Sequence, residues 1–134
     1  MDRWRIFINE NKNKDSKVVA KAVLYNDDNK ILALVSKNHD TLDLPGGHIH
    51  EGEGMEVGLK REIKEETELV VKNPTKLSYV YENRMHFYKA KMNLDKIELS
   101  SEHEEYKLLD AKEIGKLSKK FQPAAKEVVE QWDS

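Results

Sequence analysis

The amino-acid sequence predicts one mixed α/β domain in which a central sheet lies between helices. Extended and helical segments follow one another in the order β, β, β, α, β, β, β, α, α, which is typical of layered α/β folds. The chain has 134 residues, a length that supports one hydrophobic core but not two. No repeat, low-complexity tract or linker interrupts it, so we expect a single domain over residues 1–134.

Three extended segments precede the first long helix. Residues 17–25 are rich in β-type side chains, and residues 30–36 return as a second strand after the polar turn at 26–29. Residues 42–44 form a short extended piece, and the Pro-Gly-Gly sequence at 45–47 is expected to end it. We therefore expect a hairpin with a mostly buried return strand in this half of the chain.

Residues 54–67 predict an amphipathic helix that carries a group of acids. Its apolar side chains share one stripe at about 100° per residue, which is made by Met55, Leu59 and Ile63. Glu62, Glu65 and Glu66 share an arc beside this stripe, and Glu66 points into it. The acids of a solvated charged face would lie on the opposite side of the helix.

These three acids indicate a cation site. Carboxylates that lie together beside a core repel one another unless a positive charge compensates them. Oxygen ligands of this kind suit a hard divalent cation such as Mg2+ or Mn2+. Gly58 lies one turn before Glu62 and leaves room beside the acids for a ligand or a loop.

The second half of the chain completes the sheet and adds two helices. Residues 76–81 and 86–92 are expected to be strands that are joined by a turn at 82–84, and residues 106–109 a further short strand. A short helix capped by Asp110 is expected at residues 110–117. A second, amphipathic helix that begins at Pro123 is expected at residues 123–132.

The composition excludes several classes of function. The absence of cysteine excludes disulfides, thiolate metal sites and cysteine nucleophiles. The formal net charge of −2 gives no basic excess of the kind that binds duplex nucleic acid. The polar N-terminus lacks an apolar targeting region and no segment reaches membrane-spanning length, so we expect a soluble cytoplasmic protein without a membrane partner.

The stretch at residues 47–69, GHIHEGEGMEVGLKREIKEETEL, contains a spaced motif. Gly47 is followed after five residues by Glu53, and after seven more by Arg61-Glu62-Ile63, one residue, and Glu65-Glu66. This pattern resembles the signature of Nudix hydrolases, G-x5-E-x7-R-E-U-x-E-E-x-G-U, in which U is aliphatic. Every fixed position matches except one, where Glu68 replaces the final glycine.

The resemblance implies a fold, an activity and a set of metal ligands. Nudix proteins are α/β/α sandwiches with a central mixed sheet, and they hydrolyse a nucleoside diphosphate linked to another group with Mg2+ or Mn2+. By the same resemblance, Glu62, Glu65 and Glu66 would bind the metal, together with the carbonyl of Gly46. Arg61 would orient the acids, and an ion pair with Glu65 is geometrically accessible at this spacing.

Further site residues follow from the same resemblance. Glu53 would support the site or help position the attacking water, and Glu65 would also act in catalysis. Many Nudix proteins carry a later glutamate that joins the metal or acts as a base. The candidates here are Glu102, Glu104 and Glu105; Glu105 is placed in the catalytic set and the choice among the three stays open. The candidates for binding substrate are Lys37, Gly47, Arg84 and Tyr88.

The substrate is less well specified than the chemistry. Residues 121–125 resemble the F-P-P-A-N segment of bacterial 8-oxo-dGTP hydrolases, but Ala125 replaces the asparagine that reads the oxidised purine. We expect hydrolysis of a nucleoside triphosphate or related nucleotide with modest base discrimination. Dinucleoside polyphosphates, nucleotide sugars and ADP-ribose are the alternatives, and homodimers, common in the family, are an open expectation. A non-catalytic Nudix-fold nucleotide-binding module is a less favoured alternative, because a binder has no evident need for three acids. An interaction protein with an acidic helix would not explain Glu53 and the glycine pair.

Overall fold

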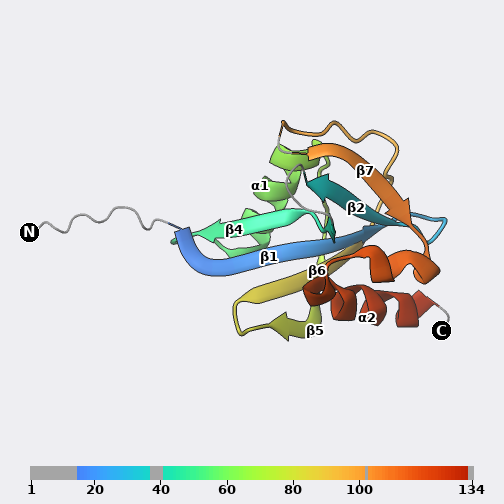
Figure 1. The fold of residues 1–134 in the computed structure, drawn as a ribbon. Helices are drawn as coiled ribbons and strands as arrows, with labels where there is room; N and C mark the ends of the chain where they lie inside the picture. The colour runs from blue at the N-terminus through green and yellow to red at the C-terminus, as the bar shows by residue number, and fades with distance from the viewer. Residues whose placement is uncertain (1–14, 37–40, 102, 133–134) are drawn as a thin grey trace, which may run out of the picture.

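One long strand, β1 (Asp15–Tyr25), organises the sheet in the computed structural model of the chain (Figure 1). It pairs antiparallel with β4 (Gly46–His50) along its first part and with β2 (Ile31–Ser36) at its end. Along its other edge it pairs in parallel with β6 (Met85–Lys91). The sheet is therefore mixed, as the sequence predicts. The structure describes residues 15–36, 41–101 and 103–132.

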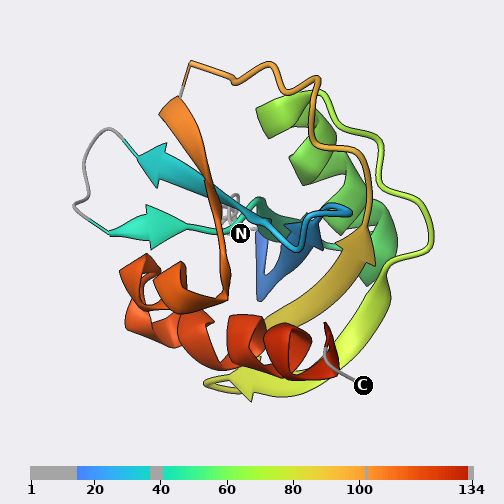
Figure 2. The same cartoon turned by 90° about the vertical axis from the view of Figure 1, so that its right-hand side faces the viewer.

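The remaining strands extend the sheet on both sides of β1. Among the described residues the sheet has seven strands in the order β3-β2-β1-β6-β5, with β4 paired to β1 and β7 to β2. The outer strands are β3 (Leu42–Asp43), β5 (Thr75–Tyr81) and β7 (His103–Leu109). The helix α1 (Met55–Thr67) and the helix α2 (Gln122–Trp132) lie on opposite faces of the sheet (Figure 2). This arrangement confirms the expected α/β/α sandwich.

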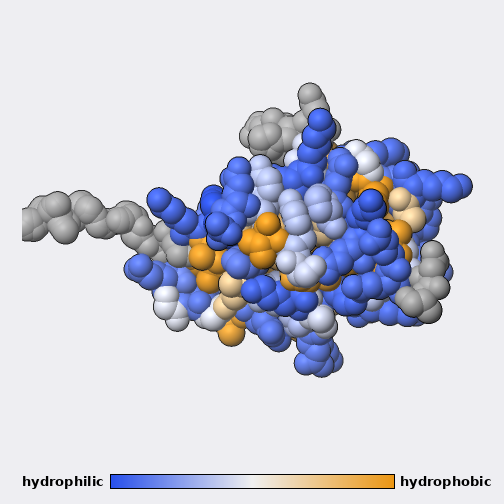
Figure 3. Space-filling view, turned by 90° about the horizontal axis from the view of Figure 1, so that it is seen from below, coloured by the Kyte–Doolittle hydropathy of each residue, from blue (hydrophilic) through white to orange (hydrophobic). Residues whose placement is uncertain are grey.

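Two hydrophobic clusters fill the layers. Alternate residues of a strand face opposite sides of a sheet, so β1 contributes to both clusters. The cluster under α1 contains Ala20, Leu24, Leu32, Leu59 and Ile63. The cluster under α2 contains Val23, Ile31, Phe87, Phe121 and Val128. The surface seen from the side of α2 is mostly hydrophilic, with small hydrophobic areas between the polar side chains (Figure 3).

The prediction that residues 45–47 only end an extended segment is wrong, because Gly46 begins the strand β4. In this strand Gly46 lies opposite Lys21, and Gly47 lies opposite Ala20. Gly46 has a φ of +132°, and a Cβ at this position would come within 2.1 Å of the Ala20 carbonyl oxygen. The glycine therefore allows the chain to turn and to pair closely with β1, which a turn signal alone does not reveal.

The other predicted elements are confirmed with small shifts at their ends. The strand expected at 106–109 begins three residues earlier, at His103. The helix expected after Asp110 is a 3₁₀ helix, η1 (Ala111–Lys116), which begins with a capping box between Asp110 and Glu113. A second short 3₁₀ helix, η2 (Lys119–Phe121), leads into α2.

The C-terminal end of α1 is held by a distant segment of the chain. Glu68 ends the helix in the left-handed conformation, with a φ of +63°, and its N–H donates to the Lys64 carbonyl. The Glu98 N–H donates to the Thr67 carbonyl at 3.0 Å, and the Ser100 N–H donates to the Glu66 carbonyl at 2.9 Å. These bonds satisfy carbonyls that a helix end leaves without partners. They also bring the segment before β7 next to the acids of α1.

The described part of the chain contains no helix with the length and apolar character that crossing a membrane requires.

Candidate metal and substrate site

Arg61 connects the acids at the centre of the site. Its Nε donates to Oε2 of Glu53 at 2.8 Å, and its Nη2 donates to Oε1 of the same carboxylate at 3.1 Å. Its Nη1 lies 3.2 Å from Oε2 of Glu62 and 3.4 Å from Oε1 of Glu65. The expected contact between Arg61 and Glu65 is therefore present. The shortest and bidentate contact, however, is with Glu53 from the loop before the helix.

Glu53 is fixed at the entrance of α1 by two kinds of donor. Besides Arg61, the His50 N–H donates to its Oε1 at 2.9 Å. The hydrogen bond from Arg61 and then that from His50 lower the pKa of Glu53 to about 2. A Cβ on Gly58 would approach Oε1 of Glu53 to 2.7 Å, so the room left by this glycine is filled by the loop carboxylate. Glu53 thus stays ionised and keeps Arg61 in place.

Gly47 makes room for Glu62. A Cβ on Gly47 would lie 2.6 Å from Oε1 of Glu62, closer than real contacts allow. The Glu62 side chain is 21% exposed, and it lies between the β4 backbone and the guanidinium of Arg61. The glycine of the motif therefore serves the carboxylate directly.

Glu66 is the most enclosed acid of the group. The Gly46 N–H donates to its Oε1 at 2.9 Å. Burial raises the pKa of Glu66 to about 7, although this hydrogen bond and the nearby Lys21 ammonium oppose the rise. The position of Glu66 toward the core agrees with the helical periodicity of the sequence. Loss of water around the carboxylate is therefore the main cause of the raised pKa of Glu66.

The three acids of α1 share one pocket. It has a volume of about 300 Å3 and is lined by Glu62, Glu65, Glu66, Ser100 and Ser101. Glu65 is the most accessible of the acids, with 59% of its side chain exposed. The serines come from the segment that is bonded to the end of α1. The pocket therefore combines an acidic helix face with a loop that is distant in sequence.

The donor set of this pocket fits a divalent cation. Its charged side chains are all carboxylates, which Mg2+ and Mn2+ prefer, and burial raises the pKa of Glu66, so a bound cation would favour its ionised form. In the residues that the structure describes, no three acids or histidines converge as closely as they would around a metal ion. The reason is visible in the contacts: Arg61 draws Glu62 and Glu65 toward itself, while Glu66 accepts from Gly46.

The comparison with protein families agrees with this geometry. A family model described as NUDIX domain matches residues 15–132. The chain belongs to the NUDIX domain family. As a member of this family it is a Nudix-type pyrophosphohydrolase. No significant match to a curated protein was found.

Solved structures share the Nudix fold over nearly the whole chain. A MutT protein from Methanosarcina mazei Go1 is 22% identical, with a TM-score of 0.69, over 92% of this chain and 99% of that one. An Ap4A hydrolase from C. elegans is 21% identical, with a TM-score of 0.72, over 86% of this chain and 98% of that one. The E. coli dihydroneopterin triphosphate pyrophosphohydrolase is 20% identical, with a TM-score of 0.69, over 87% and 97%.

Among the residues that the structure describes, the other predicted site residues do not line the pocket of the α1 acids. Glu105 lies in β7 opposite Val35, is exposed, and does not line the pocket of the α1 acids. Arg84 lies in the turn before β6, where its carbonyl accepts from the Val19 N–H at 2.9 Å. Tyr88 is 4% exposed and belongs to the core under α1, a placement that gives no support to substrate contact. Lys37 and the side chains of Glu102 and Glu104 lie outside the described residues.

Sequence reasoning missed two features near the site. Ser100 and Ser101 line the pocket. They reach it because the backbone of this segment is hydrogen-bonded to the end of α1, a contact that no local sequence pattern predicts. Lys21 is buried in β1 and contacts the turn that leads to Gly46. A signal for Lys21 exists in the sequence, since a single lysine interrupts an apolar strand, but the signal does not name its partners.

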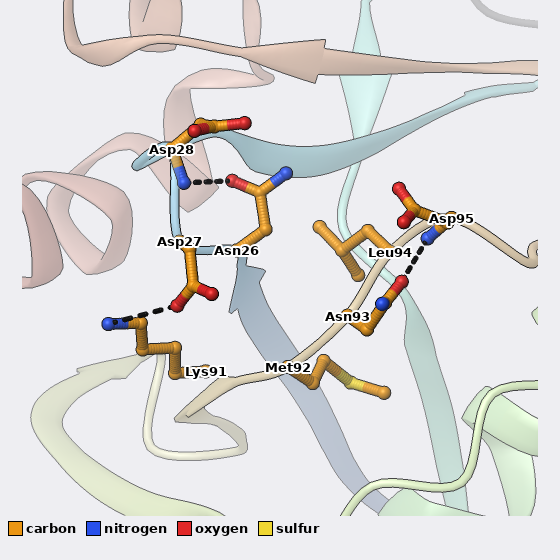
Figure 4. A pocket seen from close by; sticks show the side chains of 8 residues that line it. All are labelled: Asn26, Asp27, Asp28, Lys91, Met92, Asn93, Leu94 and Asp95. Carbon is orange, nitrogen blue, oxygen red and sulfur yellow. Dashed lines mark hydrogen bonds and ion pairs between the residues drawn. The ribbon is translucent and has the colours of Figure 1, made fainter.

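A larger hollow lies away from the Nudix motif. It has a volume of about 540 Å3 and is lined by residues 26–28 and 91–95 (Figure 4). Lys91 pairs with Asp27 at 3.3 Å, and the Asp95 N–H donates to Asn93 Oδ1 at 2.7 Å. None of the residues of the motif lines this hollow. Its size alone therefore does not make it the reaction site.

Proposed function

We propose that the protein hydrolyses a diphosphate linkage in a nucleoside diphosphate derivative, with Mg2+ or Mn2+ as cofactor. The preferred class is a nucleoside triphosphate or a related nucleotide. The observation that supports this most strongly is the pocket in which three carboxylates of α1 meet, one of which is largely enclosed and accepts from the Gly46 N–H. A diphosphate carries several negative charges, so a site for it needs cations that these acids can hold.

Each residue of the motif has a distinct part in this proposal. Glu62, Glu65 and Glu66 would hold the metal together with the Gly46 carbonyl. A bound divalent cation would offset the phosphate charge and lower the pKa of a coordinated water. Arg61 keeps Glu62 and Glu65 oriented through its guanidinium, and Glu53 in turn keeps Arg61 in place.

The base that accepts the proton from water is assigned to Glu65. Its carboxylate is the most exposed of the three, so it can reach a water at the mouth of the pocket. Glu105, an exposed residue of β7, is the alternative base. Gly47, Lys37 and Arg84 remain candidates for contact with the phosphates or the base.

The substrate class is supported by the neighbours and limited by Ala125. The named neighbours include an Ap4A hydrolase and a dihydroneopterin triphosphate pyrophosphohydrolase, so the fold serves more than one phosphorylated substrate. Ala125 is 0% exposed within the core under α2 and cannot contact a base. We therefore propose a nucleotide substrate with weak discrimination between bases, and dinucleoside polyphosphates, nucleotide sugars and ADP-ribose are the alternatives.

Phosphate release from a panel of substrates tests the proposal. The panel contains nucleoside triphosphates, nucleotide sugars, ADP-ribose and dinucleoside polyphosphates, assayed with coupling phosphatase or pyrophosphatase. Turnover should require Mg2+ or Mn2+ and stop in chelator. Glu66→Gln should lower kcat by about 100-fold or more, as loss of other catalytic groups does. Glu56→Gln is the matched control, because Glu56 is an exposed acid of the same helix outside the pocket.

The panel also separates the enzyme from a binding module. Nucleotide binding without turnover of any substrate in the presence of either metal would favour the module. The Glu66→Gln variant is first stripped of metal with chelator and is then assayed after Mg2+ or Mn2+ is added back. Full activity under these conditions would contradict the assignment of the metal ligands.

A further inference from the structure

Lys21 lies in the middle of β1 with its ammonium inside the protein. Its side chain is only 11% exposed, a rare placement for lysine. It shares a face of the strand with Val19 and Val23, and its Nζ lies 5.7 Å from the centre of the Phe121 ring. A buried ammonium is tolerated only where other groups replace the water that it has lost.

The partners of Lys21 all belong to one turn. Its Nζ donates to the Leu44 carbonyl at 3.1 Å, to Oδ1 of Asp43 at 3.2 Å and to the Gly46 carbonyl at 3.4 Å. Asp43 ends β3, Leu44 lies between the two strands, and Gly46 begins β4. The ammonium therefore ties the central strand of the sheet to the turn that precedes the Nudix helix.

The turn is fixed to the rest of the site at Gly46. On one side, the Ala22 N–H donates to the Pro45 carbonyl at 2.9 Å, and Gly46 lies opposite Lys21 in the sheet. On the other side, the Gly46 N–H donates to Glu66. One residue, Gly46, thus lies between the ammonium of Lys21, which donates to its carbonyl, and the Glu66 carboxylate, which accepts from its N–H.

We propose that Lys21 is a positioning residue of the metal site, which holds the turn at residues 43–46 so that Gly46 faces the acids of α1. The inference rests on the proposed function, in which the Gly46 carbonyl and Glu66 hold the cation. Lys21 itself would contact neither metal nor substrate. It acts through the backbone of Gly46.

Charge and position predict opposite effects when Lys21 is neutralised. Removal of a positive charge near a cation site strengthens cation binding if charge alone matters. Removal of the bonds that hold the turn weakens cation binding if position matters, because ligands that lose their supporting contacts bind metal about 10–100-fold less well. The sign of the change therefore separates the two effects.

Titration of the substrate-free protein with Mn2+, followed by electron paramagnetic resonance, measures this sign directly. Lys21→Met should weaken Mn2+ binding by about tenfold or more. Lys21→Gln is equally neutral but keeps a side-chain N–H donor, so it should retain more affinity than Lys21→Met while binding Mn2+ less tightly than wild type. Lys30→Met is the matched control, since Lys30 forms only a half-exposed pair with Asp110 at 3.9 Å. It should bind Mn2+ as wild type does.

Activity adds a second readout. At saturating substrate, the Lys21→Met enzyme should need a higher metal concentration and have a lower kcat, with a smaller change in KM for the nucleotide. Equal or tighter Mn2+ binding by both Lys21 variants than by wild type would overturn the inference. If Lys21→Met does not fold, Lys21→Gln alone decides, again by weaker or unchanged affinity relative to wild type.

Mn2+ binding and turnover by the wild-type protein distinguish a failure of this inference from a failure of the proposed function. Mn2+ binding and turnover by wild type, together with unaffected Lys21 variants, would overturn the positioning role only. Absence of both in wild type would overturn the proposed function and this inference together.

Discussion

The raised pKa of Glu66 makes the stability of the folded protein depend on pH. The folded-state pKa of Glu66 is about 7 against an ordinary 4.5, with burial as the main cause. The metal-free folded protein therefore holds this proton more firmly than the unfolded chain does. The resulting stabilisation is fully present below about pH 4.5 and is lost as the pH rises to about 7.

This loss can be measured against a neutral variant. Between about pH 5 and pH 8, the metal-free wild type should lose unfolding free energy on the order of 3 kcal/mol more than Glu66→Gln, which has no proton to release. Urea unfolding in chelator at both pH values gives the comparison, and groups other than Glu66 cancel in the difference. An identical pH dependence of the unfolding free energy in the two proteins would show that the pKa of Glu66 is not raised in the folded state. Added Mg2+ at the higher pH should stabilise wild type more than the variant.

At the scale of the residue, the acids of the site and the pair between Arg61 and Glu65 were predictable, whereas the other partners were not. Helical periodicity places Glu66 toward the core, and burial confirms this. The spacing of Arg61 and Glu65 predicts an ion pair, but the loop returns Glu53 to a better position for the guanidinium. The contacts of Lys21 depend on pairing between strands that are 25 residues apart at Gly46, and no local pattern encodes that register.

At the scale of the element, the helix that carries the motif was predictable because several local signals agree. The apolar stripe, the glycine before the helix and the acid spacing all point to residues 54–67, and α1 spans Met55–Thr67. The strand β4 was missed because Pro-Gly-Gly is a turn signal. In the structure, Gly46 instead lets the backbone of β4 pass close to the backbone of β1. The extended conformation of β4 depends on its hydrogen bonds to β1, which lies more than 20 residues away in the sequence.

The end of α1 offers a test of backbone conformation. Glu68 has a φ of +63° at a position where the family motif has glycine. A residue with a Cβ costs roughly 1 kcal/mol in this region relative to glycine. Glu68→Gly should therefore leave the unfolding free energy unchanged or raise it by up to about 1 kcal/mol, with activity retained.

Two comparisons make this test specific. The ion pair between Lys64 and Glu68 is lost in the variant, but it is half-exposed at 3.4 Å and contributes little. Glu68→Ala loses the same pair and keeps a Cβ, so it should be less stable than Glu68→Gly in urea unfolding. A lower stability for Glu68→Gly than for wild type would mean that the helix exit is held by something other than the conformation of this residue.

At the scale of the whole molecule, the proposed hydrolysis of a diphosphate does not by itself select the base of the substrate. The position that resembles the base-reading asparagine is Ala125, and it is sealed in the core under α2. Large selectivities arise where a site offers hydrogen bonds that a wrong substrate leaves unmade. We therefore expect a preference for 8-oxo-dGTP over dGTP far below the roughly 10⁴-fold that such hydrogen-bond readout can give.

The ratio of kcat/KM for 8-oxo-dGTP and dGTP under identical metal conditions measures this preference. Ala125→Asn should not create selectivity, because a buried amide would first have to find partners in an apolar core. A ratio of several thousand in wild type would show that other residues read the oxidised base.

The bonds between the end of α1 and the segment before β7 bear on how this enzyme could be adapted. The backbone N–H groups of Glu98 and Ser100 make these bonds, and main-chain donors do not change when side chains are exchanged. A loop that is anchored in this way keeps its course while its side chains vary. Directed evolution for a new substrate should therefore tolerate substitutions at Ser101, which is exposed and lines the acidic pocket, without moving the carboxylates of α1.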